Sequence, residues 1–240
     1  MLPYPETADI ETSSDGYAQR FAGEVGTWFL RIQEEATLHM LRSFPHARIL
    51  DVGGGHGQLA PAFVRHGHQV TVFGSDESCQ KRIQRLIHQN LCTFKVGNIL
   101  HLPYANQEFD VVVSYRLLPH VQEWQQYITE LTRVAQKVVM IDYPSIRSVN
   151  YIAPLLFSVK RSFEGNTRLY TSFKESELLA IFQAHSFRCA DRFAEFFFPM
   201  VLHRMMRLQR LSALLENVCR IIGLTATFGS PIILKLTRVC

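Results

Sequence analysis

A carboxylate and four glycines lie together in the stretch ILDVGGGHGQLA, residues 49–60. Asp51 ends a short apolar run, and the glycines that follow it are Gly53, Gly54, Gly55 and Gly57. Glycine loses more backbone freedom on folding than any other residue, so this cluster indicates a place where another group approaches the main chain. A carboxylate beside that backbone repels a phosphate and attracts an amine or a sulfonium cation. The residue types therefore predict a site for a positively charged ligand.

The spacing of the glycines separates two kinds of nucleotide-binding loop. Gly53, Gly55 and Gly57 form G-x-G-x-G, whereas a dinucleotide loop has G-x-G-x-x-G/A and would need a small residue at the position of Gln58. In the dinucleotide loop the helix N-terminus receives a pyrophosphate. The spacing therefore favours a cationic ligand over a diphosphate.

Three more polar side chains follow apolar runs or lie in polar loops. His120 comes after the strand predicted over 108–115, on the side of a parallel sheet where ligands bind, and it is the candidate general base. Tyr143 ends another predicted strand and could line a substrate pocket, and Arg168 could anchor an acidic group of a substrate. The alternatives are a backbone-bonded residue at a helix start for His120 and plain packing or surface roles for the other two.

Elements of alternating type position these residues. Five apolar runs of strand length, joined by amphipathic runs of helix length, predict a parallel α/β sheet with right-handed crossovers. The strands are expected at 47–52, 68–74, 92–98, 108–115 and 137–143, and the helices at 57–67, 77–90 and 121–134.

The chain on either side of these strands predicts further helices and two more strands. Apolar residues recur at helical spacing from Tyr17 to Ala36, and the sequence SFKE at 172–175 has the form of a capping box that opens a helix through about Ala184. Strands are expected at 187–198 and 230–239, with a basic, amphipathic helical stretch at 200–222 between them. For that stretch we favour packing on the body of the domain; a pocket cover, a dimer contact and a helix on a membrane surface are the alternatives.

Composition narrows the class of protein. The 240 residues carry a net charge of +4 without blocks of like charge, which argues against a nucleic-acid partner. Five scattered cysteines without a CxxC pair argue against a disulfide framework or a metal site and fit a reducing cytoplasm. The polar N-terminus does not have the form of a signal peptide, and no apolar run is long enough to predict a transmembrane segment.

The pattern Asp-x-Gly-x-Gly-x-Gly after the first strand resembles the first motif of the class I S-adenosylmethionine-dependent methyltransferases. The run VGNILHLPYANQEFDVVVSYRLLPHV, residues 96–121, resembles the later motifs of that superfamily in order. The resemblance covers roughly 47–143 and implies a Rossmann-like seven-stranded sheet, mostly parallel, with a C-terminal antiparallel hairpin and helices on both faces. It implies a single domain over 1–240, with a lid region at 1–46, a cofactor-binding core at 47–143 and substrate-side helices and a hairpin at 144–240.

The resemblance also implies roles for individual residues. It places the four glycines against the cofactor, Asp51 near its amino-acid end, Asn98 and Ile99 at the adenine, and Tyr115 and Arg116 beside the methyl group. Tyr17 and Phe21 resemble lid residues. The family binds the ribose with a carboxylate at the end of the second strand, and the usual spacing puts that position at Gly74. We assign the ribose to Asp76, two residues later; backbone groups with water, or a helix N-cap role for Asp76, are the alternatives.

The function that the resemblance implies is methyl transfer from S-adenosylmethionine, with S-adenosylhomocysteine as the product. The aromatic run FAEFFFPM, residues 193–200, favours a small apolar or aromatic acceptor, and the chain looks most like quinone and secondary-metabolite methyltransferases. The alternatives are methylation of protein or nucleic acid, and a non-catalytic, cofactor-binding partner subunit. A homodimer is possible.

Overall fold

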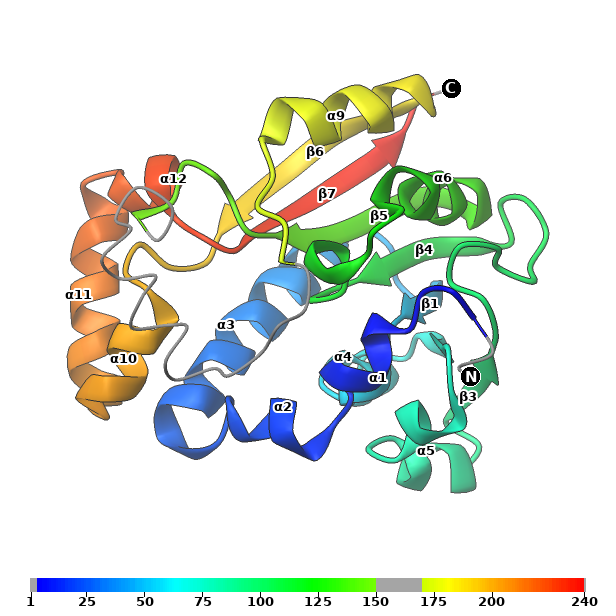
Figure 1. Ribbon diagram of the computed structural model, residues 1–240, viewed down its shortest axis with the longest axis horizontal. Helices are drawn as coiled ribbons and strands as arrows, with labels where there is room; N and C mark the ends of the chain where they lie inside the picture. Colours follow the sequence, from blue (N-terminus) through cyan, green and yellow to red (C-terminus); the bar gives the residue numbers. More distant parts are fainter. Residues whose placement is uncertain (1–3, 150–169, 240) are drawn as a thin grey trace.

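The computed structural model describes residues 4–149 and 170–239, and a seven-stranded sheet runs through the centre of the molecule (Figure 1). The strand order is β3-β2-β1-β4-β5-β7-β6. The first five strands are parallel, and β7 is antiparallel to both of its neighbours. The strands are β1 (Arg48–Val52), β2 (Gln69–Gly74), β3 (Cys92–Val96), β4 (Phe109–Ser114), β5 (Ala135–Tyr143), β6 (Phe187–Ala194) and β7 (Ile232–Arg238). The predicted fold class is confirmed.

Helices cover both faces of this sheet. The α-helices are α1 (Ala8–Thr12), α2 (Asp15–Gln19), α3 (Gly23–Leu41), α4 (Leu59–Arg65), α5 (Gln84–His88), α6 (Trp124–Val134), α9 (Glu175–Ala184), α10 (Met200–Met206), α11 (Gln209–Ile221) and α12 (Leu224–Phe228). Short 3₁₀ turns are η1 (Gly54–His56), η2 (Glu77–Gln80) and η3 (Leu118–His120). The described helices do not include one that is both long enough and apolar enough to cross a membrane.

The strands read as near-continuous apolar runs because both of their faces are buried. In β1, Ile49 packs in a cluster with residues of α3 and α4, whereas Leu50 packs in the opposite cluster with residues of α6 and α9. In β4, Val111 and Val112 divide between the same two clusters. Side chains alternate across a strand, so this arrangement fixes the register of the sheet at its centre.

Three of the predicted helices are interrupted. The N-terminal helix is divided into α2 and α3 just before Gly23, which has a φ of 74°. The helix expected at 77–90 is divided into η2 and α5. The stretch 200–222 is divided at Arg207, whose φ of 54° ends α10 and turns the chain into α11.

Two sequence-based expectations in the C-terminal third were wrong. The capping box is absent: α9 begins at Glu175, no side chain caps it, and the Glu175 carboxylate accepts hydrogen bonds from Tyr143 and Arg192 instead. The apolar face of 200–222 does not pack on the body of the domain. The residues of α11 that are buried are Ser212, Glu216 and Cys219, and most of its large apolar side chains are exposed.

Candidate active site

The glycine loop joins β1 to α4 at the carboxyl edge of the parallel strands. Gly53 and Gly57 have φ values of 77° and 72°, a left-handed conformation that glycine adopts without strain. A β-carbon added to Gly54 would lie 2.1 Å from Oδ2 of Asp51. The loop backbone is therefore held directly against the Asp51 carboxylate, and a larger residue could not make this approach.

Asp51 is a buried carboxylate without a bonded partner. Its exposed fraction is 0%, and neither carboxylate oxygen accepts a hydrogen bond from the described residues. Burial raises the pKa of Asp51 to about 7, although the charge of Arg116 acts to lower it. Burying an unpaired carboxylate is costly, and a cationic group in contact with it would remove much of this cost. The unpaired Asp51 carboxylate and the glycine backbone beside it therefore fit a ligand that carries a positive charge.

Helix α1 lies across the glycine loop, which sequence reasoning did not predict (Figure 1). The buried Asp9 carboxylate accepts hydrogen bonds from the Ser75 backbone N–H at 2.6 Å and from the Ser75 hydroxyl at 2.5 Å. The Ser13 hydroxyl would lie 2.5 Å from a β-carbon on Gly55. Residues 9–13 therefore pack directly against the glycine loop. Local sequence patterns do not predict the contact between Asp9 and Ser75, because the two residues are 66 positions apart in the chain.

Asp76 lies two residues after the end of β2 and acts as the N-cap of η2. Its Oδ1 accepts a hydrogen bond of 2.8 Å from the Ser78 backbone N–H. Hydrogen bonds from Ser78 hold the pKa of the Asp76 carboxyl below its usual value. Gly74 ends β2, and a β-carbon there would lie 3.3 Å from Oδ2 of Asp9. The Asp9 carboxylate thus lies beside Gly74, the position at which the resemblance predicts a ribose-binding carboxylate, and Asp76 follows Gly74 by two residues.

The loop after β3 carries the two residues assigned to the adenine. Oδ1 of Asn98 accepts a hydrogen bond of 2.9 Å from the Leu100 backbone N–H, and Ile99 is fully buried. The Asn98 side chain therefore shapes the turn that leads into the Leu-Pro-aromatic sequence. Its remaining amide group is not engaged by a described residue.

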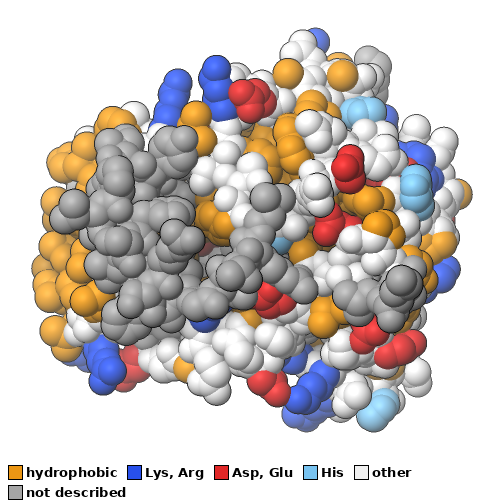
Figure 2. All heavy atoms as spheres, viewed as in Figure 1, with side chains coloured by type: hydrophobic (Ala, Val, Ile, Leu, Met, Phe, Trp, Pro, Cys, Tyr) orange, Lys and Arg blue, Asp and Glu red, His pale blue; other side chains and the backbone are white. Residues whose placement is uncertain are grey.

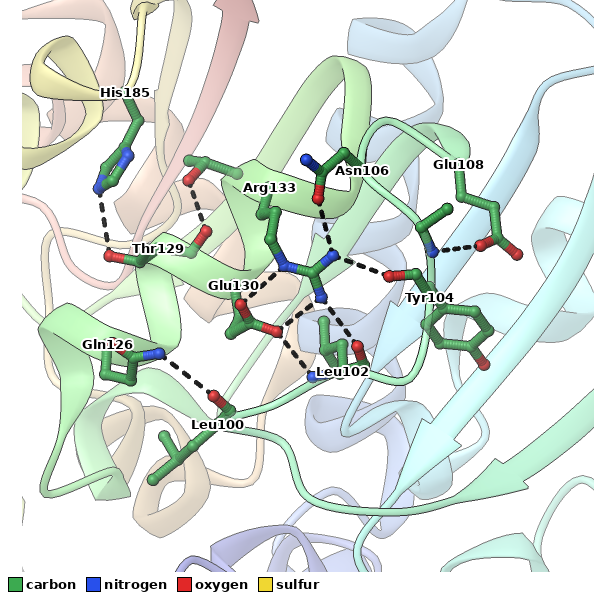
Figure 3. A network of polar contacts seen from close by, with 12 residues as sticks. Leu100, Leu102, Tyr104, Asn106, Glu108, Gln126, Thr129, Glu130, Arg133 and His185 are labelled. Carbon is green, nitrogen blue, oxygen red and sulfur yellow. Dashed lines mark hydrogen bonds and ion pairs between the residues drawn. The ribbon is translucent and has the colours of Figure 1, made fainter.

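An ion pair on α6 holds this loop in place (Figure 3). Arg133 donates to the backbone carbonyls of Leu102 and Tyr104 at 2.8 and 2.7 Å, and its Nε donates to Glu130 at 2.8 Å. Glu130 in turn accepts the Leu102 backbone N–H at 2.7 Å. Three of these contacts are made with the main chain, and Arg133 also donates to the Asn106 side chain at 3.1 Å, so the pair fixes the path of the loop mainly through its backbone.

A second buried polar cluster lies at the ends of β4, β5 and β6. Asp142 accepts the Arg116 backbone N–H at 2.6 Å, and Gln33 of α3 donates to both Asp142 and Glu195 at 3.2 and 2.9 Å. The Arg116 guanidinium donates to Gln33 at 2.7 Å and lies 4.4 Å from the ring centre of Phe21. Arg116 has a φ of 60°, an uncommon conformation for a residue other than glycine.

The two carboxyls of this cluster hold protons unusually tightly. Burial raises the pKa of Asp142 to about 6, against the lowering effect of the Arg116 N–H. Burial and the charge of Asp142 raise the pKa of Glu195 to about 8. Groups with such pKa values can accept or donate a proton near neutral pH. Sequence reasoning missed Gln33 and Glu195; Glu195, as the one carboxylate in the run FAEFFFPM, was the available signal.

The remaining predicted residues lie in different surroundings. Tyr115 is fully buried, with its hydroxyl 3.0 Å from that of Thr37. Tyr143 donates a hydrogen bond of 2.5 Å to Glu175. The His120 ring is in η3 and makes an edge contact with Tyr170, with ring centres 5.6 Å apart.

The two predicted lid residues contact each other and the second polar cluster. The rings of Tyr17 and Phe21 are 5.8 Å apart, and Phe21 lies below Arg116. Arg168 lies outside the described residues. The structure thus brings Phe21 and Arg116 together, and it brings the glycines and Asp51 together, while the hydroxyls of Tyr115 and Tyr143 are bonded to Thr37 and Glu175.

The strand order, the glycine loop and the buried carboxylate at the end of β1 define a Rossmann-like methyltransferase domain. Residues 50–139 match a family model described as a methyltransferase domain, and this segment resembles the class I S-adenosylmethionine-dependent methyltransferases. The match covers the glycine loop and ends within β5.

Relatives of similar sequence carry methyltransferase names. An uncharacterized methyltransferase of Schizosaccharomyces pombe is 30% identical over 128 residues, which are 48% of this chain and 45% of the relative. A demethylmenaquinone methyltransferase of Deinococcus radiodurans is 27% identical over 165 residues, 63% of this chain and 66% of the relative. The chain therefore matches less than half of the length of the Schizosaccharomyces relative.

A solved structure of similar fold covers nearly the whole chain. Magnesium protoporphyrin IX methyltransferase from Synechocystis PCC 6803 with bound S-adenosylhomocysteine is 16% identical, with a TM-score of 0.66 over 94% of each chain. The cyclase SpnF shares the fold at 19% identity and a TM-score of 0.58, covering 86% of this chain and 79% of SpnF. Proteins of this fold therefore include at least one that is named for a different reaction.

Proposed function

We propose that this protein transfers a methyl group from S-adenosylmethionine to a small apolar or aromatic molecule. The observation that carries the proposal is Asp51, whose buried carboxylate accepts no hydrogen bond from any described residue and lies against a glycine backbone. S-adenosylmethionine carries a positively charged amino group on its amino-acid end and a methyl group on a sulfonium, which makes the methyl group electrophilic. A nicotinamide dinucleotide would instead bring a diphosphate toward the carboxylate.

The residues at the carboxyl edge divide the binding of this cofactor among them. Asp51 binds the cationic amino-acid end, and the backbone from Gly53 to Gly57 lies along it. The carboxylate of Asp76 binds the ribose hydroxyls. Asn98 and Ile99 contact the adenine, in the loop that Arg133 holds in place. Residues 1–46 form the lid, because α1 must move for a ligand to enter between Ser13 and the glycine loop.

Proton removal from the acceptor is assigned to groups beside the methyl position. His120 remains the candidate base from the sequence, and Arg116 and Tyr143 contribute to the walls of the acceptor site. The raised pKa of Glu195 makes its carboxyl a second candidate for receiving the proton, with the Gln33 amide holding Glu195 and Asp142 in place by donating to both. The relatives include a demethylmenaquinone methyltransferase and a methylenesterol methyltransferase. An apolar acceptor of that kind would suit the apolar residues around Phe196.

Direct titration tests the cofactor assignment. Calorimetry with S-adenosylmethionine, S-adenosylhomocysteine and NADH should show binding of the first two and not of the third. Incubation with labelled methyl donor and small-molecule extracts should then transfer label to an apolar product. Binding without transfer to any small molecule would favour a partner subunit, and label in protein or nucleic acid would favour the macromolecular alternatives. The absence of binding to a folded protein would refute the proposal.

The variant Asp51→Asn should weaken binding of S-adenosylmethionine by about 1–3 kcal/mol, the usual scale for a hydrogen bond to a charged group. The same change removes a buried charge, so the free energy of unfolding at pH 8 should not fall. Calorimetry and urea unfolding measure the two quantities, with the exposed Asp191→Asn as the matched control. Unchanged affinity in Asp51→Asn would remove this residue from the site.

The free thiols of the described cysteines support a reducing compartment. We therefore assign the protein to the cytoplasm, with one domain over 1–240 that comprises the lid, the core at 47–143 and the substrate-side segment at 144–240. The substrate-side segment is assigned from its position after the core in the chain.

A further inference from the structure

The outward side of α10 and α11 is an apolar surface on a protein whose other large apolar residues are mostly buried. Eight large hydrophobic residues are exposed there, with exposed fractions that reach 59% at Leu214 and 76% at Ile221: Leu202, Met205, Leu208, Leu211, Leu214, Val218, Ile221 and Ile222. Figure 2 shows hydrophobic side chains gathered at the edge of the molecule where Figure 1 places α11. At 3.6 residues per turn, the exposed apolar residues of α11 and Ile222 after it lie within about 100° of arc around the helix axis, so these five form one stripe. The other three are exposed on α10 and at its junction with α11. We call these eight residues the α10–α11 stripe.

Polar contacts on the inward side fix the orientation of this stripe. The buried Glu216 accepts the backbone N–H groups of Phe197 and Phe198 at 2.8 Å each, and His203 of α10 lies 2.9 Å from it. Arg220 donates to the backbone carbonyls of Ala194 and Glu195 at 3.2 and 2.7 Å. Rotating α11 to bury the stripe would break all of these bonds. The stripe therefore faces outward as a consequence of the fold.

The segment that carries the stripe contributes exposed charge of one sign, and from outside it Glu11 of α1 lines a pocket with Arg204, Met205 and Arg207. From Phe197 to Val239 the sequence contains a single carboxylate, Glu216, and it is buried. Arg204, Arg207 and Arg210 lie in the same two helices or between them, and Arg207 and Arg210 are exposed. Within the described ranges neither Arg207 nor Arg210 forms an ion pair. The surface thus combines an outward apolar stripe with positive charge that has no exposed carboxylate beside it in this segment.

We propose that the α10–α11 stripe docks on an anionic lipid surface. An amphipathic helix with arginines beside its apolar face lies in the plane of a membrane interface, with its apolar side chains among the acyl chains and its cations at the headgroups. A second copy of this chain would bring the same arginines together, so the charge favours a negatively charged partner over self-association. The proposal does not depend on methyl transfer, because it rests only on this surface.

Flotation of the full chain with vesicles tests the proposal. The protein should bind vesicles that contain phosphatidylglycerol and phosphatidylcholine, and should bind phosphatidylcholine vesicles far more weakly. Leu214→Ser with Ile221→Ser should abolish binding, whereas Leu91→Ser, a similarly exposed leucine before β3, should not. Arg207→Gln with Arg210→Gln should weaken binding about fivefold for each arginine removed, and Arg85→Gln on α5 should have no effect.

A local readout places the contact on the protein. In Leu214→Trp the additional fluorescence should shift to shorter wavelength on anionic vesicles, and in Leu91→Trp it should not. Equal binding to neutral vesicles, or undiminished binding by the Leu214 and Ile221 double variant, would overturn the proposal. A dimer in light scattering that loses its association in this double variant, without vesicle binding by the native protein, would assign the stripe to a second copy instead.

Discussion

The carboxyl groups of Asp51 and Glu195 are both buried at the edge of the sheet where the parallel strands end. They differ in how far their positions could be predicted from the sequence. Asp51 stands in a short glycine-rich motif, so its position could be predicted from neighbouring residues. Glu195 meets Gln33 across 162 positions, and Gln33 meets Asp142 across 109. Contacts at such separation depend on how helices pack on the sheet, and local spacing does not contain that information.

The buried carboxyl of Glu195 makes stability depend on pH. Its pKa rises from an ordinary 4.5 to about 8 on folding, so the folded protein holds this proton more tightly than the unfolded chain. The resulting stabilisation is fully present below about pH 4.5 and is lost as the pH rises through about 8. Asp142 and Asp51, with pKa values of about 6 and about 7, act in the same direction.

We therefore expect Glu195→Gln to be more stable than the native protein at pH 8.5, by roughly 1–3 kcal/mol, and to differ little at pH 5. Urea unfolding at a series of pH values measures this difference, with the exposed Glu24→Gln as control. A native protein whose stability did not fall between pH 5 and pH 8.5 would contradict the assigned protonation.

The two proposed roles of Asp76 can be separated by one substitution. Asp76→Ser retains a good N-cap for η2, because serine caps helices about as well as aspartate, but it removes the carboxylate. We expect nearly native stability and a loss of about 1–3 kcal/mol in binding of S-adenosylhomocysteine, measured by calorimetry. If the affinity for S-adenosylhomocysteine stayed the same, the ribose would be assigned to Asp9 or to backbone groups instead.

At the scale of elements, the strands were predictable and the helix boundaries were less so. All five core strands lie within a few residues of their expected positions, since a strand buried on both faces is a distinct apolar run. The stretch 200–222 shows the limit of this reasoning. Apolar periodicity identifies a helix with one apolar face, but it does not tell whether that face meets the protein. Here Glu216 and His203 provide the inward contacts.

Helix α1 offers a test of the lid at the same scale. Asp9→Asn replaces a carboxylate that accepts two bonds from Ser75, and one end of the new amide would present N–H groups to those donors. We expect α1 to detach more readily, with amide hydrogen exchange in residues 7–14 faster by a factor of five or more, equivalent to about 1 kcal/mol.

Hydrogen exchange measured by mass spectrometry with and without S-adenosylhomocysteine tests this expectation. Asp191→Asn serves as the control, because Asp191 is exposed and distant from α1 in the chain. Exchange in 7–14 that matched the native protein would show that Asp9 does not hold the lid.

For the whole molecule, the sequence predicted a mostly parallel sheet with a terminal hairpin, and the strand order confirms it. The hydrophobic pattern was sufficient for the parallel part, because parallel strands with crossover helices allow few topologies, whereas the antiparallel hairpin was implied by the family resemblance. The position of α1 over the glycine loop could not be predicted, since a five-residue helix has too little pattern to show what it contacts.

Cofactor binding should stabilise the entire domain. A ligand that binds only the folded state at about one hundred times its dissociation constant adds about 2.7 kcal/mol. For a chain of this size we expect S-adenosylhomocysteine to raise the melting temperature by roughly 5–10 °C, measured by calorimetry. NADH at the same concentration should leave it unchanged, and an equal shift with NADH would argue for a dinucleotide site.

The last strand, β7, occupies an interior place between β5 and β6. While a ribosome is still synthesising residues 232–238, β5 has an unpaired edge and β6 has no neighbour to join. Unpaired edges of this kind invite pairing with other chains. The nascent polypeptide thus passes through an aggregation-prone stage that ends only when residues 232–238 have emerged and β7 can pair with both neighbours.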